Sequence, residues 1–317
     1  MSNSGLLELI GSTPLVELRA LAEESTAKVF AKLEYLNPSG SIKDRIALRM
    51  IEDAELRGAL RPGFAILESS TGNTGIAISF VGAVRRYKVI IYETTPGGIG
   101  TDKVRIMQRY GAEVRSLRPE DSEETGEGSV AGAEVELPGR QLCLELEKSN
   151  SQCWWARQFS NPWNTLAHHQ TGEEILAQTN GRVDVFVASI GTGGTLKGIA
   201  EVLKDANPNV KIVGIQPASS KMAIVPGVPY PASEVDGGII SEMVVVPSLI
   251  DDVVRVKDEE AVEFAHHVWA AGFFAGVSSG ANALVALREA RRMPRGNVVT
   301  VFPDSGDRYL TEEHYVT

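Results

Sequence analysis

A glycine-rich turn, residues 191–195 with the sequence GTGGT, directly follows an apolar run and opens a helix-like segment. At such a strand-to-helix turn, unpaired backbone N–H groups and the positive end of the helix dipole point toward an anion. Glycine lets the backbone approach phosphate oxygens closely, and the threonine hydroxyls add hydrogen-bond donors. The turn therefore predicts a phosphate site, with a turn that binds no ligand as the alternative.

The same turn does not indicate a nucleotide. It does not match the G-x-G-x-x-G dinucleotide fingerprint, and no P-loop lysine follows it. An acidic residue at the offset expected for a ribose partner is also missing.

A second turn, Ser70 to Gly75, has the sequence STGNTG and again joins a strand-like run to a helix-like run. It carries more hydroxyl and amide side chains than a chain reversal needs, and this composition suits a carboxylate held at a helix N-terminus. Serine, threonine and asparagine are also ordinary N-cap residues, so a cap without a ligand is the alternative.

Lys43 lies in the segment NPSGSIKDR, where Pro38 and Gly40 mark a turn and the lysine begins a helical run. A single lysine is most often a solvated charge. Together with a phosphate-type turn and a carboxylate-type turn, however, it completes the parts that a pyridoxal-phosphate site needs.

The histidine and cysteine pairs do not indicate a metal site. His168 and His169 are adjacent and cannot face one way on a helix, so we interpret them as structural residues. Cys143 and Cys153 suit neither a zinc cluster nor a disulfide framework, and we interpret them as buried or incidental thiols. No metal is expected.

The elements that must position these groups alternate between two periodicities. Short apolar runs bounded by Gly or Pro alternate with longer segments of helical period, which is typical of α/β proteins with mostly parallel sheets covered on both faces. The two strand-turn-helix units predict two lobes that face one cleft. The predicted strands are KVFAKLEY, GFAILES, YKVIIYE, VDVFVASI, VKIVGIQP and NVVTVFPD, and the predicted helices are KDRIALRMIEDAELRG, TGIAISFVGAVRRY, TDKVRIMQRYG, GTLKGIAEVLKDANP, DEEAVEFAHHVWAAG and SGANALVALREARRM.

Composition limits the partners. The 317-residue chain has a formal net charge of −10, which argues against nucleic-acid binding and against an anionic membrane surface. Trp154 and Trp155 are accordingly interpreted as core or lobe-interface residues rather than a base-stacking platform.

The first residues lack a secretory pattern and no apolar run has the length of a membrane span, so a cytoplasmic location is expected. The acidic, glycine-rich stretch 118–140 is predicted to be a long surface loop.

Six ordered motifs resemble the cysteine synthase family of pyridoxal-phosphate enzymes. The resemblance extends from GSTPLVEL at residue 11 to Leu310 and is carried by PSGSIKDR, ESSTGNTGI, QFSNPWN with the following HHQTGEEI, GTGGTLKG, GFFAGVSSGAN and FPDSGDRYL. It implies the tryptophan synthase β type of fold, known as fold type II. The smaller, mobile substrate lobe would span residues 48–157, and the larger cofactor-binding lobe would span 1–47 and 158–317.

The resemblance also implies roles for single residues. Lys43 would form the Schiff base and later move the Cα proton, Asn73 would lie beside the ring hydroxyl of the cofactor, and Ser305 would bind the pyridine nitrogen. The phosphate cradle would be Gly191, Thr192, Gly193, Gly194 and Thr195. The substrate α-carboxylate would be gripped by Ser70, Thr71 and Gln158, and the wider substrate-binding set would include Gly72, Asn73 and Gly237.

The activity that the resemblance implies is β-replacement, with O-acetylserine and sulfide giving cysteine and acetate through an aminoacrylate. Within the same fold, the alternatives are O-phosphoserine as the donor, cystathionine formation, and the synthesis of diaminopropionate or another β-substituted alanine. A non-catalytic role in binding a partner is a further alternative. A homodimer is expected, and the C-terminal peptide of a serine acetyltransferase is a possible partner.

The chain departs from the family pattern on the substrate side of the predicted cleft. The order Ser70-Thr71 replaces the usual Thr-Ser, segment 93–102 differs, and the region around Gly237 and Gly238 resembles the glycine-rich substrate loop only loosely. The reaction type is therefore a firmer expectation than the substrate.

Overall fold

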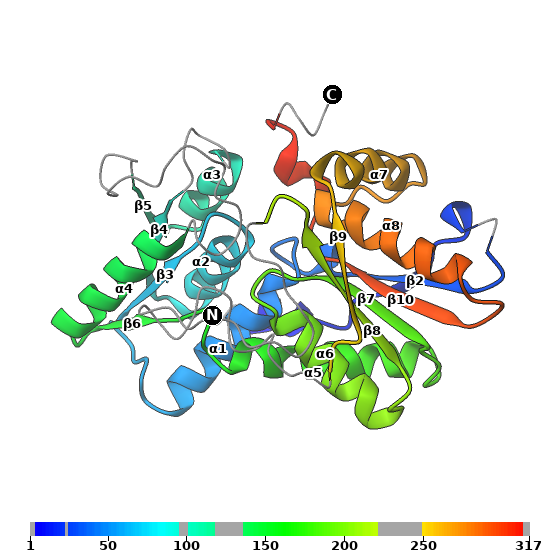
Figure 1. The fold of residues 1–317 in the computed structure, drawn as a ribbon. Coiled ribbons are helices and arrows are strands. Elements are labelled where there is room, and N and C mark those ends of the chain that lie inside the picture. The colour runs from blue at the N-terminus through cyan, green and yellow to red at the C-terminus, as the bar shows by residue number, and fades with distance from the viewer. Residues whose placement is uncertain (1–3, 23–24, 95–100, 118–135, 221–248, 313–317) are drawn as a thin grey trace.

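Two β-sheets form the framework of the protein (Figure 1). The structure is a computed structural model that describes residues 4–22, 25–94, 101–117, 136–220 and 249–312. The larger sheet has the strand order β1-β2-β10-β7-β8-β9, and only the β1–β2 pair is antiparallel. Its strands are β1 (Leu15–Glu17), β2 (Lys28–Leu33), β7 (Val185–Ser189), β8 (Lys211–Pro217), β9 (Asp252–Val256) and β10 (Asn297–Phe302). The smaller sheet is wholly parallel, in the order β5-β4-β3-β6, with β3 (Ala65–Ser69), β4 (Lys88–Glu93), β5 (Glu113–Ser116) and β6 (Cys153–Trp155).

Helices cover both faces of the larger sheet, because side chains along a strand alternate between its faces. Val298 of β10 packs with α7 (Asp258–Ala270) and α8 (Val277–Arg291), whereas the next residue, Val299, packs with α6 (Gly194–Ala206) and α5 (Trp163–Gln178). Figure 1 shows these two helix pairs on opposite sides of the sheet. Burial of each large apolar side chain contributes roughly 1.5–3 kcal/mol to folding.

The smaller sheet follows the same rule. Helices α1 (Lys43–Leu56), α2 (Asn73–Arg85) and α3 (Thr101–Arg109) share one apolar cluster, and α4 (Leu137–Ser149) packs against the other face. Trp154 lies in the first cluster and Trp155 in the second, as their adjacent positions on β6 require. Both are buried, so the interpretation of the two tryptophans as core residues is confirmed.

Every strand and helix predicted from periodicity is present, but the periodicity did not indicate β1, β5, β6, β9, α4 or α5. These four strands are short or carry little apolar alternation. The prediction of a surface loop over 118–140 was wrong at its end: α4 begins at Leu137, with Pro138 in its first turn. Arg140 is fully buried, and its guanidinium packs over the ring of Phe159, 4.7 Å from the centroid. Residues 118–135 lie outside the described part of the chain.

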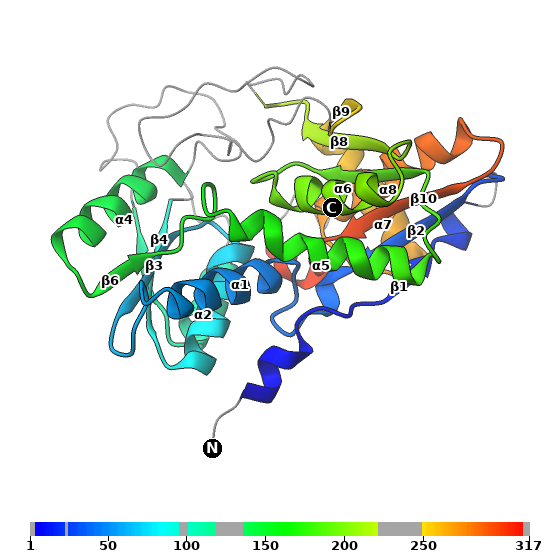
Figure 2. The same ribbon diagram turned by 90° about the horizontal axis from the view of Figure 1, so that it is seen from below.

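Each of the two sheets belongs to one of the two lobes predicted from the sequence, whose boundaries were placed at residues 48 and 157. The four strands of the smaller sheet fall within 48–157, and the six strands of the larger sheet fall outside that range. Helix α1 spans the first boundary, and Figure 2 shows it beside α5 between the sheets. The boundary itself stays a prediction.

A buried ionic network attaches α1 to the larger sheet. Arg45 forms two hydrogen bonds with Glu34, both 2.8 Å, and two with Glu174, at 2.8 and 2.9 Å. Lys32 of β2 adds a second cation, with its Nζ 2.7 Å from Glu174 Oε2. Removing one partner from such a cluster leaves a buried charge without compensation, which is strongly destabilising. The network thereby holds in place the helix on which Lys43 lies.

Glu174 makes the stability of the fold sensitive to acid. Burial would raise the pKa of Glu174, but hydrogen bonds from Arg45, Lys32 and Ser12 and the charge of Arg45 outweigh it and lower the pKa from 4.5 to about 2. A lowered pKa in the folded state means that this stabilisation is present above pH 4.5 and is lost as the pH falls toward 2. After allowance for solvent screening, we expect about 2 kcal/mol of unfolding free energy to be lost over that interval.

Urea unfolding at pH 7 and at pH 2.5 tests this expectation. Glu174→Gln should be clearly less stable than the wild type at pH 7, and the difference should shrink at pH 2.5. Glu173→Gln, at the exposed neighbouring position, is the control and should change little. An equal difference in stability between the wild type and Glu174→Gln at both pH values would contradict the assignment.

Candidate active site

The turn that carries Lys43 is held by a segment from the far end of the chain. The Ile42 N–H donates to Pro303 O at 2.8 Å, and an isolated β-bridge joins Ser41 to Asp304. Gly40 has φ +88°, a conformation that a side chain rarely adopts, and a Cβ there would also press on the Arg308 guanidinium. The segments PSGSIKDR and FPDSGDRYL, which are far apart in the sequence, are therefore in direct contact in the fold.

The Lys43 amine is coupled electrostatically to polar groups from three segments of the chain. Burial is the largest cause of its lowered pKa, and charge from Glu136 and then Asp304 acts in the opposite direction. Lys43 in turn helps to lower the pKa of His168. The charge of this amine is thereby coupled to Glu136, which contacts the second turn, to His168, which contacts the GTGGT turn, and to Asp304 of the C-terminal segment. A lowered pKa also leaves more of the amine unprotonated and nucleophilic.

The GTGGT turn has the geometry of an anion site. Strand β7 ends at Ser189, α6 begins at Gly194, and Gly193 adopts φ +90°. A Cβ at Gly191 would meet nothing within 4 Å, so the backbone there borders open space. Asn164 supports the turn, because its Nδ2 donates to Thr192 Oγ1 at 3.0 Å and to Gln158 O at 2.6 Å.

His168 contacts the end of this turn, which the sequence interpretation did not foresee. Its Nε2 lies 3.1 Å from Thr195 Oγ1, and its Nδ1 lies 3.3 Å from Thr171 Oγ1. The ring is fully buried, and burial lowers its pKa well below the ordinary value, so it is neutral. His169 points elsewhere, to Glu201 at 2.7 Å. In the described ranges no group of three or more His, Cys, Asp or Glu is arranged to hold a metal. The interpretation of the pair as structural stays a prediction.

The second turn is ordered by its own hydroxyl group. Ser70 Oγ accepts from the N–H groups of Gly72 at 3.2 Å and Gly75 at 3.0 Å, so it caps the start of α2. The N–H of Thr71 donates to Glu136 Oε1 at 3.2 Å. Ser70 therefore acts as a cap in this turn, and a ligand role for the turn stays a prediction.

Gln158 is fixed beside this turn. Its Oε1 accepts from Thr74 Oγ1 at 2.6 Å, and its Nε2 donates to Ser69 O at 3.0 Å and to Glu136 Oε2 at 2.8 Å. Glu68, fully buried on β3, accepts from the Gln158 backbone N–H at 3.0 Å. Glu68 and Glu136 were missed by sequence reasoning, since nothing in their local sequence marks a carboxylate that folds inward.

Asn73 joins the two lobes. Its Nδ2 donates to Asp304 Oδ2 at 2.6 Å, and its Oδ1 accepts from the Arg308 guanidinium. Tyr309 also donates to Asp304 Oδ2 at 2.6 Å. Asn73 is thereby held close to the Lys43 turn, because Asp304 forms the bridge with Ser41.

Ser305 lies next to the start of α8. A bridge joins it to Ala275, and the N–H of Gly306 donates to Phe274 O at 3.2 Å. The first turn of α8, which follows Ala275 in the chain, carries Ser278 and Ser279; Ser278 and Ser305 are partly buried, and Ser279 is buried. Ser278 is thus a second hydroxyl that the sequence interpretation missed. Gly237 lies outside the residues that the structure describes.

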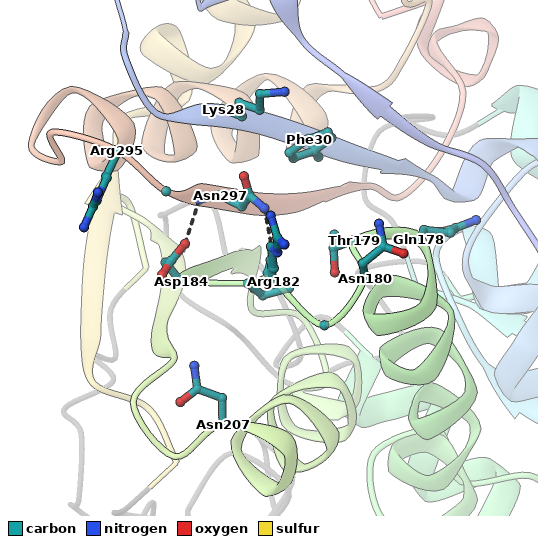
Figure 3. A pocket seen from close by; sticks show the side chains of 13 residues that line it. Lys28, Phe30, Gln178, Thr179, Asn180, Arg182, Asp184, Asn207, Arg295 and Asn297 are labelled. Carbon is teal, nitrogen blue, oxygen red and sulfur yellow. Dashed lines mark hydrogen bonds between the residues drawn. The ribbon is translucent and has the colours of Figure 1, made fainter.

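A cavity of about 770 Å³ lies on the larger lobe but is not this site (Figure 3). Its lining includes Lys28 and Asn297, the first residues of β2 and β10, and Asp184, which precedes β7. Asp184 accepts from the Asn297 backbone N–H at 2.8 Å. The cavity is therefore at the amino ends of the parallel strands, opposite the carboxyl ends where ligands of such sheets bind.

Comparison with known proteins identifies the family to which the chain belongs. Residues 6–304 match the family model described as "Pyridoxal-phosphate dependent enzyme". The chain belongs to this pyridoxal-phosphate dependent enzyme family. The cysteine synthase of Staphylococcus aureus is 37% identical over 316 residues, which cover 98% of this chain and 96% of that protein.

Solved structures show the same fold in members of this family. O-acetyl serine sulfhydrylase isoform 3 of Entamoeba histolytica has a TM-score of 0.82 and 32% identity, covering 98% of this chain and 91% of the other. O-ureido-L-serine synthase has a TM-score of 0.83 and 33% identity, covering 98% and 94%. The predicted family, the two-lobed α/β fold of type II and the dependence on pyridoxal phosphate are confirmed. Among the described helices, none is long and apolar enough to cross a membrane.

The residues present fit the cofactor of this family. Lys43 supplies a partly buried amine of lowered pKa, which favours attack on an aldehyde to form a Schiff base. The open space beside Gly191 and the N-terminus of α6 suit a phosphate. When bound, pyridoxal phosphate supplies the electron sink for cleavage at the β carbon of an amino acid.

Proposed function

We propose that this enzyme converts O-acetylserine and sulfide to cysteine and acetate by β-replacement. In the balanced reaction the C–O bond to acetate breaks, a C–S bond forms at the same carbon, and the proton removed from Cα is returned. The observation that carries the proposal is the electrostatic coupling of the Lys43 amine to His168, which contacts the phosphate-type turn, and to Glu136, which contacts the carboxylate-type turn. The similarity to cysteine synthases over nearly the whole chain supports it.

Lys43 is proposed to hold the cofactor and then to move the Cα proton. Its lowered pKa favours the neutral amine, which is the form that attacks a carbonyl and accepts a proton. The backbone N–H groups of the GTGGT turn are proposed to bind the phosphate, with Thr195 oriented by neutral His168. This cradle consists of Gly191, Thr192, Gly193, Gly194 and Thr195.

The α-carboxylate of the amino acid is proposed to bind at the start of α2. Thr71 and Gln158 supply N–H donors there, and Ser70 keeps the turn in shape. Gly72 belongs to the same turn, and Gly237 is retained as a proposal from the family pattern. Asn73 is proposed to lie beside the ring hydroxyl of the cofactor, with its orientation set by Asp304 and Arg308.

A serine hydroxyl is proposed to bind the pyridine nitrogen. Ser305 is the residue that the family pattern indicates, and Ser278 is the second candidate that the structure adds. Both belong to the segments joined by the Ala275–Ser305 bridge, so either hydroxyl belongs to the larger lobe.

A donor panel tests the proposal. The holoenzyme is mixed with sulfide and with O-acetylserine, O-phosphoserine or serine, and free cysteine and the released leaving group are measured. We expect cysteine and acetate in equal amounts, with O-acetylserine by far the best donor. If O-phosphoserine or serine is preferred, that compound is the donor in place of O-acetylserine. If a product forms only with a nucleophile other than sulfide, the enzyme makes cystathionine, diaminopropionate or another β-substituted alanine. No β-replacement with any donor would favour the non-catalytic, partner-binding role.

Three further expectations stay predictions. These are a homodimer, a cytoplasmic location and binding of a serine acetyltransferase C-terminal peptide. The peptide would present its terminal carboxylate to the proposed substrate anchor.

A further inference from the structure

The carboxylate anchor at the start of α2 already holds a carboxyl group of this chain. Glu136 Oε1 accepts from the Thr71 N–H at 3.2 Å and lies 3.5 Å from Thr71 Oγ1, and its Oε2 accepts from Gln158 Nε2 at 2.8 Å. The other hydrogen of that amide group is directed to Ser69 O at 3.0 Å. Both hydrogens of the Gln158 amide and the N–H of Thr71 are thus used, so a second carboxylate has no vacant donor among these three.

The backbone around Glu136 directs its side chain to this position. Glu136 O accepts from Ser69 Oγ at 2.9 Å, which pins the start of α4 to the end of β3. Gly139 packs so closely on Ser69 that an added Cβ would collide with the serine hydroxyl. Glu136 is itself buried, with 8% of its surface exposed. The contact is therefore built into the packing of α4 rather than being a chance position of an exposed side chain.

The charges around Glu136 allow it to be displaced. Burial raises its pKa to about 8, and the neighbouring carboxylate of Glu68 acts in the same direction, while Thr71, Arg140 and Lys43 oppose the rise. Near neutral pH much of Glu136 is therefore a neutral acid. An ionised substrate carboxylate is a stronger acceptor for the same donors, because hydrogen bonds to charged groups are stronger than those between neutral groups.

We infer that Glu136 is a tethered competitor for the α-carboxylate anchor, and that it sets the affinity of this enzyme for its amino-acid substrate. The amino acid binds when the Glu136 side chain withdraws from Thr71 and Gln158. The inference rests on the proposed role of these two residues as the substrate anchor. If the anchor is occupied about nine-tenths of the time, the apparent Kd for an amino acid is raised about tenfold.

Titration of the holoenzyme with L-alanine tests the inference, because alanine carries the α-carboxylate but no leaving group. Binding is followed by the change in the visible absorbance of the cofactor, and propionate, which has no amine, is titrated as a competitor. We expect Glu136→Ala to lower the apparent Kd of both ligands by about tenfold, with a smaller decrease for Glu136→Gln. Glu145→Ala, at an exposed position of α4, is the matched control and should leave both constants unchanged.

A Gln158→Leu variant tests the substrate anchor separately from the competitor role of Glu136. If Gln158→Leu leaves alanine binding unchanged, the anchor assignment in the proposed function fails. If Gln158→Leu weakens binding but neither Glu136 variant strengthens it, the anchor stands and the competitor role is overturned. Weaker binding in both Glu136 variants, at unchanged cofactor content and circular dichroism, would mean that Glu136 helps to bind substrate and would also overturn the inference.

Discussion

Replacement of Lys43 by alanine is expected to remove β-replacement activity, with kcat lower by roughly 10³-fold or more. One amine is proposed both to hold the cofactor and to move the Cα proton, so its loss affects two steps. The visible absorbance of the protein-bound Schiff base should disappear, although the phosphate cradle should still bind the cofactor. Steady-state kinetics and the absorbance spectrum of the reconstituted protein measure the two effects.

Two further variants distinguish the chemical role of the Lys43 amine from the effect of its positive charge. Lys43→Arg keeps a cation at this position but cannot form the Schiff base at ordinary pH, so it should be as inactive as Lys43→Ala. Lys148→Ala, at an exposed position near the end of α4, should retain wild-type rates. Retained activity and absorbance in Lys43→Ala would remove the basis of the proposed mechanism.

Replacement of Gly194 by alanine is expected to weaken cofactor binding by roughly 10- to 100-fold, since overpacking of this kind costs about 1–3 kcal/mol. An added Cβ at Gly194 would collide with the Asn164 side chain. Asn164 is buried and holds both Thr192 Oγ1 and Gln158 O. The methyl group should therefore disturb the GTGGT turn and the support of Gln158 together.

Equilibrium dialysis of pyridoxal phosphate against the apoprotein measures this effect without reference to turnover. Gly5→Ala is the control for a glycine-to-alanine change, because its Cβ would meet nothing within 4 Å. An unchanged Kd in Gly194→Ala, with the fold intact by circular dichroism, would show that this turn does not bind the phosphate.

Some of the departures from the family pattern lie at the residues that contact Glu136. Ser70 and Thr71 stand in reversed order, and Thr71 is the residue whose N–H and hydroxyl face Glu136. Gly139 packs against Ser69, next to the same turn. Substrate affinity in this enzyme is therefore expected to depend on α4 as well as on the turn itself.

Local patterns predicted the parts of the site that depend on a few consecutive residues. The turn of Gly193 needs a positive φ, which glycine permits, and the start of α2 needs a hydroxyl cap, which Ser70 provides. Short continuous apolar runs likewise predicted the central parallel strands, because buried strands such as β7 are apolar on both faces. Short strands such as β6 were missed because three residues carry too little periodicity.

Contiguous residues were enough to identify the family, the two helix-terminus turns and Lys43, since each of these is encoded in a short stretch of the chain. The folded chain was needed to find which distant groups meet them: His168 at Thr195, Asp304 at Asn73, and Glu136 at Thr71 and Gln158. An inward-facing histidine or carboxylate is stabilised by partners from other elements, and its own neighbours in the chain do not reveal them. The same residue types in an exposed segment would have been solvated charges.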